Sequence, residues 1–141
     1  MNNLIYYTCI FIICSIIGHM FEHFMFYRKQ GLLYKYTGID GIFPMYGVGI
    51  MIILLCGKLL QYHDNLFAVI LITTLIITAY ECSWGYIAMQ LNNGIPMWNY
   101  DKFKHTACNK TISLNTSIFW MLIIGFTYMY IVPTIEQYEY K

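Results

Sequence analysis

The chain contains four apolar stretches, each long enough to cross a lipid bilayer, and this pattern constrains its fold more than any other feature. A membrane-spanning helix needs roughly 20 apolar residues to cover a hydrocarbon core about 30 Å thick. The stretches lie at about residues 4–27, 42–60, 66–91 and 114–133. We therefore predict an all-α integral membrane four-helix bundle, built from two helical hairpins in one transmembrane domain over residues 1–141.

The composition agrees with a membrane protein and excludes other classes. Hydrophobic residues make up 59% of the chain and charged residues only 11%, whereas a soluble domain carries about 25% charged residues. The formal net charge of +1 gives no field that would attract a polyanion, so we expect no nucleic-acid partner. The expected partner is the lipid bilayer itself.

The distribution of basic residues predicts an orientation. With four crossings both chain ends share one side, and the loops after the first and third stretches share the other. Those two loops hold Arg28, Lys29, Lys35, Lys102, Lys104 and Lys110, while the opposite side holds Lys58 and Lys141. The positive-inside rule then places the two loops in the cytoplasm and the termini on the non-cytoplasmic side.

The five cysteines give no framework of disulfides by their spacing. They are Cys9, Cys14, Cys56, Cys82 and Cys108, and four of them fall inside apolar stretches. No C-x-x-C pair is present. We therefore expect them to pack as small buried hydrophobic side chains.

Glu22 in the first apolar stretch and Glu81 in the third are the strongest indication of a functional site. An Asp at the centre of a membrane helix costs roughly 2.5–3.5 kcal/mol on insertion, so such residues normally face protein or water. Both lie in the half of the membrane nearer the first and third loops, where polar and aromatic residues also gather. The predicted pocket consists of Glu22, Glu81, Trp98, Tyr100, Tyr46, Asp101 and His19. The alternative is that each glutamate is a hydrogen-bonding partner in helix packing.

No pattern predicts a cofactor or a catalytic residue. His19, Glu22 and His23 match the H-x-x-E-H order of inverted zinc peptidases, and histidines four residues apart share a helix face. A tight zinc site needs a third protein ligand, and no spacing selects one. We expect no metal and no cofactor, and an enzyme is the less favoured class.

Glycines in the second stretch point to close helix packing and to a weak internal repeat. Gly47 and Gly49 are the kind of small residue that lets membrane helices approach each other. The segment Gly41–Gly47 (GIFPMYG) follows Glu22, and Gly94–Tyr100 (GIPMWNY) follows Glu81. Each hairpin thus reads as an acid, a loop, then Gly-Ile, Pro-Met and an aromatic residue, which raises the hypothesis of an internal duplication.

The same residues carry a resemblance to a known family. The strings IIGHMFEHF, GLLYKYTGIDGIFPMYGVGIMII, YECSWGYIAMQLNNGIPMWNYDKF and TISLNTSIFW resemble the motifs GWxxE, GFLYGPxxPIYGxG, E-x-x-x-G…WDYS and GQICLxxSLLW. These motifs are typical of the putative ABC-transporter type IV (CmpB-like) membrane proteins, and the transmembrane protein 229 family shows a similar order. The resemblance covers roughly residues 15–122.

The resemblance implies a set of functional and structural positions. The matching residues are Gly18, Glu22, Pro44, Tyr46, Gly47, Gly49, Glu81, Gly85, Trp98, Tyr100, Ile112 and Trp120. Four positions depart from the family pattern: His19 replaces a tryptophan, Asn99 an aspartate, Asp101 a serine and Lys110 a glycine. If the family pocket needs an acid between Trp98 and Tyr100, Asp101 has taken that role or the role is lost.

Three functions remain open from the sequence. The first is a permease-like component of a solute or ion pathway, working as a homo-oligomer or with other membrane subunits, in which Glu22 and Glu81 bind a cation or a proton. The second is a non-catalytic membrane partner that stabilises another protein. The third is a lipid-binding or lipid-active protein, with Glu22 or Glu81 as a base.

Overall fold

The computed structural model describes residues 3–22, 44–91, 93–94, 96 and 98–139 of the chain. The prediction of an all-α fold is confirmed, since helices make up most of the described part and its strands are one hairpin of two residues each. The elements are α1 (Asn3–Glu22), α3 (Pro44–Leu59), α4 (Leu66–Leu91), β1 (Thr106–Ala107), β2 (Ile112–Ser113), α5 (Leu114–Phe126), the π-helical turn η2 (Thr127–Ile131) and α6 (Val132–Glu139).

Local chemistry sets where the helices begin. Helix α3 begins at Pro44, where proline lacks only an N–H that would be unbonded in a first turn. The Asn65 side chain accepts a hydrogen bond from the Ala68 N–H at 3.1 Å and so caps α4. Ser113 caps α5: its hydroxyl accepts from the Thr116 N–H, and the Thr116 hydroxyl accepts from the Ser113 N–H.

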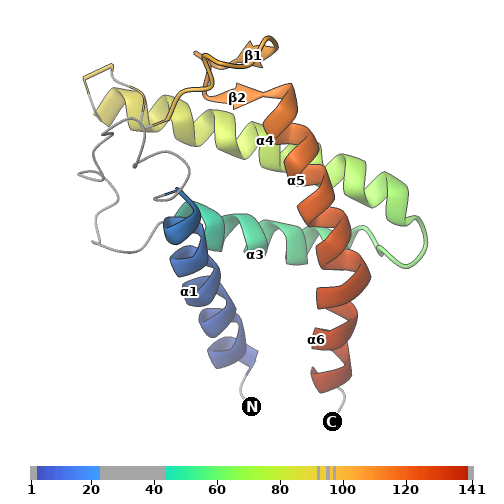
Figure 1. Cartoon of the computed structure of the whole chain (residues 1–141). Helices are drawn as coiled ribbons and strands as arrows, with labels where there is room; N and C mark the ends of the chain where they lie inside the picture. The colour runs from blue at the N-terminus through green and yellow to red at the C-terminus, as the bar shows by residue number, and fades with distance from the viewer. Residues whose placement is uncertain (1–2, 23–43, 92, 95, 97, 140–141) are drawn as a thin grey trace.

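The helices pack in the order of the sequence, α1 on α3, α3 on α4 and α4 on α5. In Figure 1, α1 and the α5–α6 rod stand steeply, and α3 and α4 run across them. Both termini lie at one end of the molecule, and the β1–β2 hairpin lies at the other end (Figure 1). The fold therefore has an end that carries the hairpin and an end that carries the termini.

In the part of the chain that the structure describes, three helical segments have the length and apolar character needed to cross a membrane. They are Leu4–Phe21, Leu66–Gln90 and Leu114–Gln137. The apolar part of α3, Met45–Leu59, is shorter. Residues 23–27 of the first expected span lie outside the described part of the chain.

The last span continues beyond Pro133, where the sequence predicts its end. The wide turn η2 joins α5 to α6 without a break, and the Val132 N–H donates to the Thr127 carbonyl. Pro133 therefore falls in the first turn of α6, directly after a shift in the backbone hydrogen-bonding pattern. A proline at that place removes no bond that a regular helix interior would need.

Tyr128 connects three helices in the centre of the core. Its side chain is only 1% exposed. The hydroxyl donates to the Ile53 carbonyl of α3 at 2.7 Å and lies 3.0 Å from the Thr73 hydroxyl of α4. Its ring stacks on Tyr62 and covers Gly57, where a Cβ would come within 2.6 Å of it. The η2 turn is thus fixed to both α3 and α4.

Glycines allow α1 and α3 to approach closely. A Cβ at Gly18 would lie 2.2 Å from the Tyr46 ring, and one at Gly47 would lie 2.2 Å from the Ser15 hydroxyl and 2.8 Å from the Phe11 carbonyl. Gly49 is different, because its nearest neighbour, Trp120, would be 3.9 Å away. Small residues are therefore needed at the first two positions and not at the third.

The two segments of the hypothetical repeat differ in the parts that the structure describes. Met45–Gly47 lies in the first turns of α3, whereas residues 98–100 form an irregular segment. Both nevertheless contribute to one buried cluster, which contains Met45, Trp98 and Tyr100. The shared residues meet in space without sharing a local structure.

Candidate functional site

Glu81 is the centre of the candidate site. It lies in α4, ten residues before the end of the helix, and is only 2% exposed. The Tyr100 hydroxyl donates a hydrogen bond to its Oε1 atom at 3.2 Å. A carboxyl group so deeply buried in an apolar helix is expensive unless it is hydrogen-bonded. Tyr100 supplies one of these bonds from the segment that follows α4.

The segment carrying Trp98 and Tyr100 is fixed by hydrogen bonds to the hairpin. The indole N–H of Trp98 donates to the Thr111 carbonyl at 2.7 Å, and both groups are buried. The backbone N–H of Tyr100 donates to the Lys110 carbonyl at 2.9 Å. These bonds place the two aromatic rings, 5% and 6% exposed, in a cluster beside α4 rather than in water.

The hairpin in turn is fixed on α4. Thr111 packs on Gly85, where a Cβ would come within 2.6 Å of the Thr111 side chain. Gly85 and Glu81 are one helical turn apart, so the glycine that admits the hairpin and the glutamate occupy one face of α4. A disulfide joins Cys82 of α4 to Cys108 of the hairpin. We call residues 98–113 the cover of Glu81.

The disulfide corrects the expectation that all cysteines are isolated hydrophobic side chains. Cys82 and Cys108 are bonded, and Cys9, Cys14 and Cys56 are free. The signal was present in the sequence, because Cys108 is the one cysteine outside the apolar stretches. Cys108 lies in the polar loop after α4, and this loop folds back against α4.

The tip of the hairpin has an unusual backbone. Cys108, Asn109 and Lys110 all have positive φ angles, of 51°, 55° and 67°. Only glycine adopts this left-handed region without steric cost. Lys110 is the position where the sequence resemblance implies glycine, and its φ of 67° is a conformation that suits glycine.

Asp101 does not join the pocket. It is exposed, forms an ion pair with Lys110, and accepts a hydrogen bond from the Asn99 amide at 2.7 Å. The bonds from Lys110 and then from Asn99 hold the pKa of Asp101 below its ordinary value of 3.8. Its role in the structure is to brace the outer side of the cover, and Glu81 is the acid inside.

The other predicted pocket residues come from α1 and α3. Tyr46 packs against the cluster of Met45, Trp98 and Tyr100, and its ring also contacts Trp120 and Phe21. His19 is half-buried in the last turn of α1. Glu22 is the final residue of α1, and its side chain, like the whole of His23, lies outside the described part.

Two further aromatic residues belong to the site and were not predicted from the sequence. Tyr80 and Trp84 of α4 pack against the same cluster, and the Tyr80 hydroxyl lies 3.5 Å from the Met45 carbonyl. The Trp84 indole N–H finds no acceptor in the part of the chain that the structure describes. Trp84 lies three residues after Glu81, a spacing that puts both on one helix face, and this was the available signal. Tyr80, one residue before Glu81, has no such spacing.

The chemistry available to this site is that of a protected carboxyl group among aromatic rings. Such a group can hold a proton or pair with a cation, and aromatic faces add attraction for a cation. Within residues 3–22, 44–91 and 98–139, no group of three or more His, Cys, Asp or Glu side chains is placed to hold a metal ion. Among the described side chains, the site therefore offers the Glu81 carboxyl group and several aromatic rings.

The apolar helices and the buried membrane carboxylate define an integral membrane protein. The family model described as "putative ABC-transporter type IV" matches residues 9–141, and the chain belongs to this family. No curated protein and no solved structure matches the chain. The resemblance to the transmembrane protein 229 family stays a prediction.

Proposed function

We propose that the protein is a permease-like component of a pathway for a proton or a small cation, and that Glu81 is its binding residue. The observation that carries this proposal is the burial of Glu81 beneath a cover that is bonded to the same helix. Membrane proteins rarely retain a buried acid without a use for it, because the cost of insertion is high. The transporter-related family of the chain agrees with this function.

The surroundings of Glu81 favour binding over a purely structural role. A structural glutamate would need only hydrogen-bond donors. This one lies among aromatic side chains from three separate segments, α3, α4 and the cover. Tyr100 can donate to the carboxylate and, after small rotations, release it to a cation.

We further propose that the chain works as an oligomer or with other membrane subunits. Only 11% of the apolar window of α1 is buried within the structure. Four helices also enclose little space of their own. A pathway past Glu81 then has walls contributed by a second subunit, as in other helical membrane assemblies.

The test compares Glu81→Gln with Asp101→Asn. The purified protein is reconstituted in liposomes that contain a pH-sensitive dye, and a potassium diffusion potential drives proton entry. We expect Glu81→Gln to lower the rate of uptake at least about tenfold, because the amide can neither hold a proton nor pair with a cation. Asp101→Asn removes an acid of the same cover from its exposed side, and we expect a change of less than about twofold.

Two results would contradict the proposal. Equal rates for the wild type and Glu81→Gln would remove the binding role of this carboxyl group. A wild-type rate equal to that of empty liposomes, with a second protein co-purifying in fixed ratio, would favour the non-catalytic partner instead.

We also propose an orientation in which the cover faces an oxidising compartment. The basic residues, six against two, favour the opposite side for this loop. The Cys82–Cys108 disulfide argues more strongly, because disulfides persist in oxidising compartments and are rare in the cytosol. In this orientation both termini face the cytoplasm.

A further inference from the structure

Two cavities follow the same helices, and Glu81 lines neither of them, although Tyr46 of the candidate site lines the first. The first has a volume of about 450 Å³ and lies between α1, α3 and α5. The second, of about 440 Å³, lies between the start of α1, the end of α3, the α3–α4 loop and α6. Neither has been used in the proposed function.

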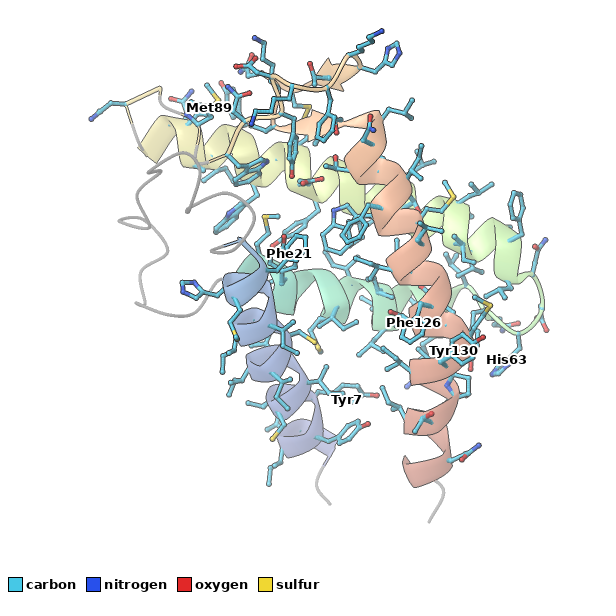
Figure 2. The ribbon with its side chains drawn as sticks, viewed as in Figure 1. Tyr7, Phe21, His63, Met89, Phe126 and Tyr130 are labelled. Carbon is cyan, nitrogen blue, oxygen red and sulfur yellow. A yellow bond between two sulfur atoms is a disulfide. The ribbon has the colours of Figure 1, made fainter. Side chains whose placement is uncertain are left out.

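The lining residues show that the two cavities follow one another. On α3, Tyr46 to Ile53 line the first cavity and Leu54 to Lys58 line the second. On the α5–α6 rod, residues 119–131 line the first and residues 132–136 line the second. Because these linings are consecutive on both helices, we call the two cavities together the cleft. Figure 2 shows Phe21 at the end of α1, Phe126 on α5, and Tyr7 directed from α1 toward α6.

The two parts of the cleft differ in chemistry. The first part is lined almost entirely by apolar side chains, among them Ile17, Ile50, Phe119 and Phe126. The second part holds Lys58, Asp64 and Glu136 together with Tyr62 and His63. The cleft therefore runs from an apolar chamber to a chamber with both signs of charge.

The polar chamber is organised by hydrogen bonds to Glu136. Its Oε2 atom accepts from the Tyr62 hydroxyl at 2.8 Å and lies 3.3 Å from His63 Nε2. Burial, and then the neighbouring Glu136, raise the pKa of Tyr62 to about 12. Tyr62 thus stays a donor at neutral pH and holds the carboxylate in place.

We propose that this cleft binds one zwitterionic phospholipid, with an acyl chain in the apolar part and the headgroup in the polar part. Lys58 suits a phosphate, and Glu136 with Asp64 suits an ammonium group. The length agrees as well. The α5–α6 residues along the cleft extend roughly 25 Å at the helical rise, and one leaflet with its headgroups is about 20–22 Å thick.

The proposal is independent of Glu81 and is tested on the full chain. The protein is purified in detergent, incubated with phosphatidylethanolamine or phosphatidylglycerol, and the bound lipid is counted by native mass spectrometry. We expect about one phosphatidylethanolamine per chain, bound at least about tenfold more tightly than phosphatidylglycerol. Soluble phosphoethanolamine, which has the headgroup but no acyl chains, is added as a competitor.

Variants at each end of the cleft separate the two contributions. Lys58→Gln and Glu136→Gln are expected to weaken phosphatidylethanolamine binding about tenfold each, and Ile17→Trp, which fills the apolar part, is expected to lower its occupancy. Asp101→Asn, on the exposed side of the cover, should leave binding unchanged. The unfolding temperature without lipid is measured for each variant, so that loss of binding is read only from variants that fold.

Three results would overturn the inference. Equal binding of phosphatidylglycerol would refute the role of the mixed charges. Full displacement by phosphoethanolamine at equal concentration would show a headgroup-sized solute as the ligand and no use of the apolar part. Unchanged binding in folded Lys58→Gln, Glu136→Gln and Ile17→Trp would place the lipid outside this cleft.

Discussion

Lys110 has a backbone conformation that suits glycine. Its φ of 67° costs an L-residue roughly 1–2 kcal/mol. The side chain recovers part of this through its ion pair with Asp101, but exposed pairs contribute little. The backbone strain at Lys110 is therefore offset only in part by the ion pair on the outer side of the cover.

This balance predicts the effect of Lys110→Gly. We expect the free energy of unfolding to stay the same or rise by up to about 1 kcal/mol, because the strain is relieved and only an exposed pair is lost. The matched control is Lys104→Gly in the same loop, which relieves no strain and should lower stability by about 0.5–1 kcal/mol. Thermal unfolding followed by tryptophan fluorescence measures both. A loss of stability in Lys110→Gly equal to that in Lys104→Gly would refute the argument.

Asp101 predicts a pH dependence with a definite sign. Because its pKa is lowered in the folded protein, its carboxylate adds stability above its ordinary pKa, and this is lost as the pH falls through the folded value. We expect the unfolding temperatures of the wild type and Asp101→Asn to differ at pH 6 and to converge below pH 3.8. A difference that grows on acidification would contradict the sign.

At the scale of elements, α1 and α3 are held together by small residues in contact. At Gly47 the nearest neighbours are the Ser15 hydroxyl and the Phe11 carbonyl. The carbonyl belongs to the helix backbone and cannot rotate away. The packing of these two helices thus depends on the missing side chain.

Gly47→Ala and Gly49→Ala form a matched pair in one helix. We expect Gly47→Ala to cost about 1–3 kcal/mol, because α1 must shift to admit the Cβ. Gly49→Ala has room for its Cβ and gains helix propensity, so its stability should be unchanged or slightly higher. Chemical unfolding in detergent micelles compares the two. Equal costs would mean that helix propensity and not packing decides.

The existence and the approximate bounds of most helices could be predicted from the sequence. Apolar length predicted the helices and the start of α5 at Leu114, because this signal is local. The course of the helix through Pro133 could not be predicted, since it depends on the η2 turn that Tyr128 fixes to α3 and α4.

The site was harder to predict because its residues are brought together by long-range contacts. Glu81, Trp98 and Tyr100 were identified as unusual residues near one end of the membrane. Their contact depends on the hairpin returning to α4, through Gly85 and Cys82. Asp101 was misplaced because it lies one residue from Tyr100, and neighbouring residues in an irregular segment need not face the same way.

At the scale of the whole molecule, the hairpin and the termini lie at opposite ends (Figure 1), and these ends differ in chemistry. The first is closed by the disulfide, and the second carries the polar part of the cleft. This distinction predicts which compartment each end meets.

The orientation can be measured with engineered cysteines in intact cells. Single cysteines replace Lys104, in the cover, or Gln137, in α6, in a chain where Cys9, Cys14 and Cys56 are serine and the disulfide is kept. We expect a membrane-impermeant maleimide added outside to label position 104 and not position 137, as the disulfide implies. Labelling of 137 alone would support the orientation given by the basic residues, and lysed cells supply the control in which both react.

The turn Thr127–Ile131 has a consequence for how the two parts of the cleft are aligned. Each residue of an α-helix turns the chain by about 100°, and a π turn accommodates one residue more than the regular helix would. The turn thereby acts as a rotational offset between residues 119–126 and residues 132–136. Deleting one residue from it would restore regular α-helical hydrogen bonding, but would rotate Ile135 and Glu136 away from the cleft. The polar and apolar parts of the cleft thus lie in line because the Thr127–Ile131 turn rotates the side-chain directions of α6 relative to α5.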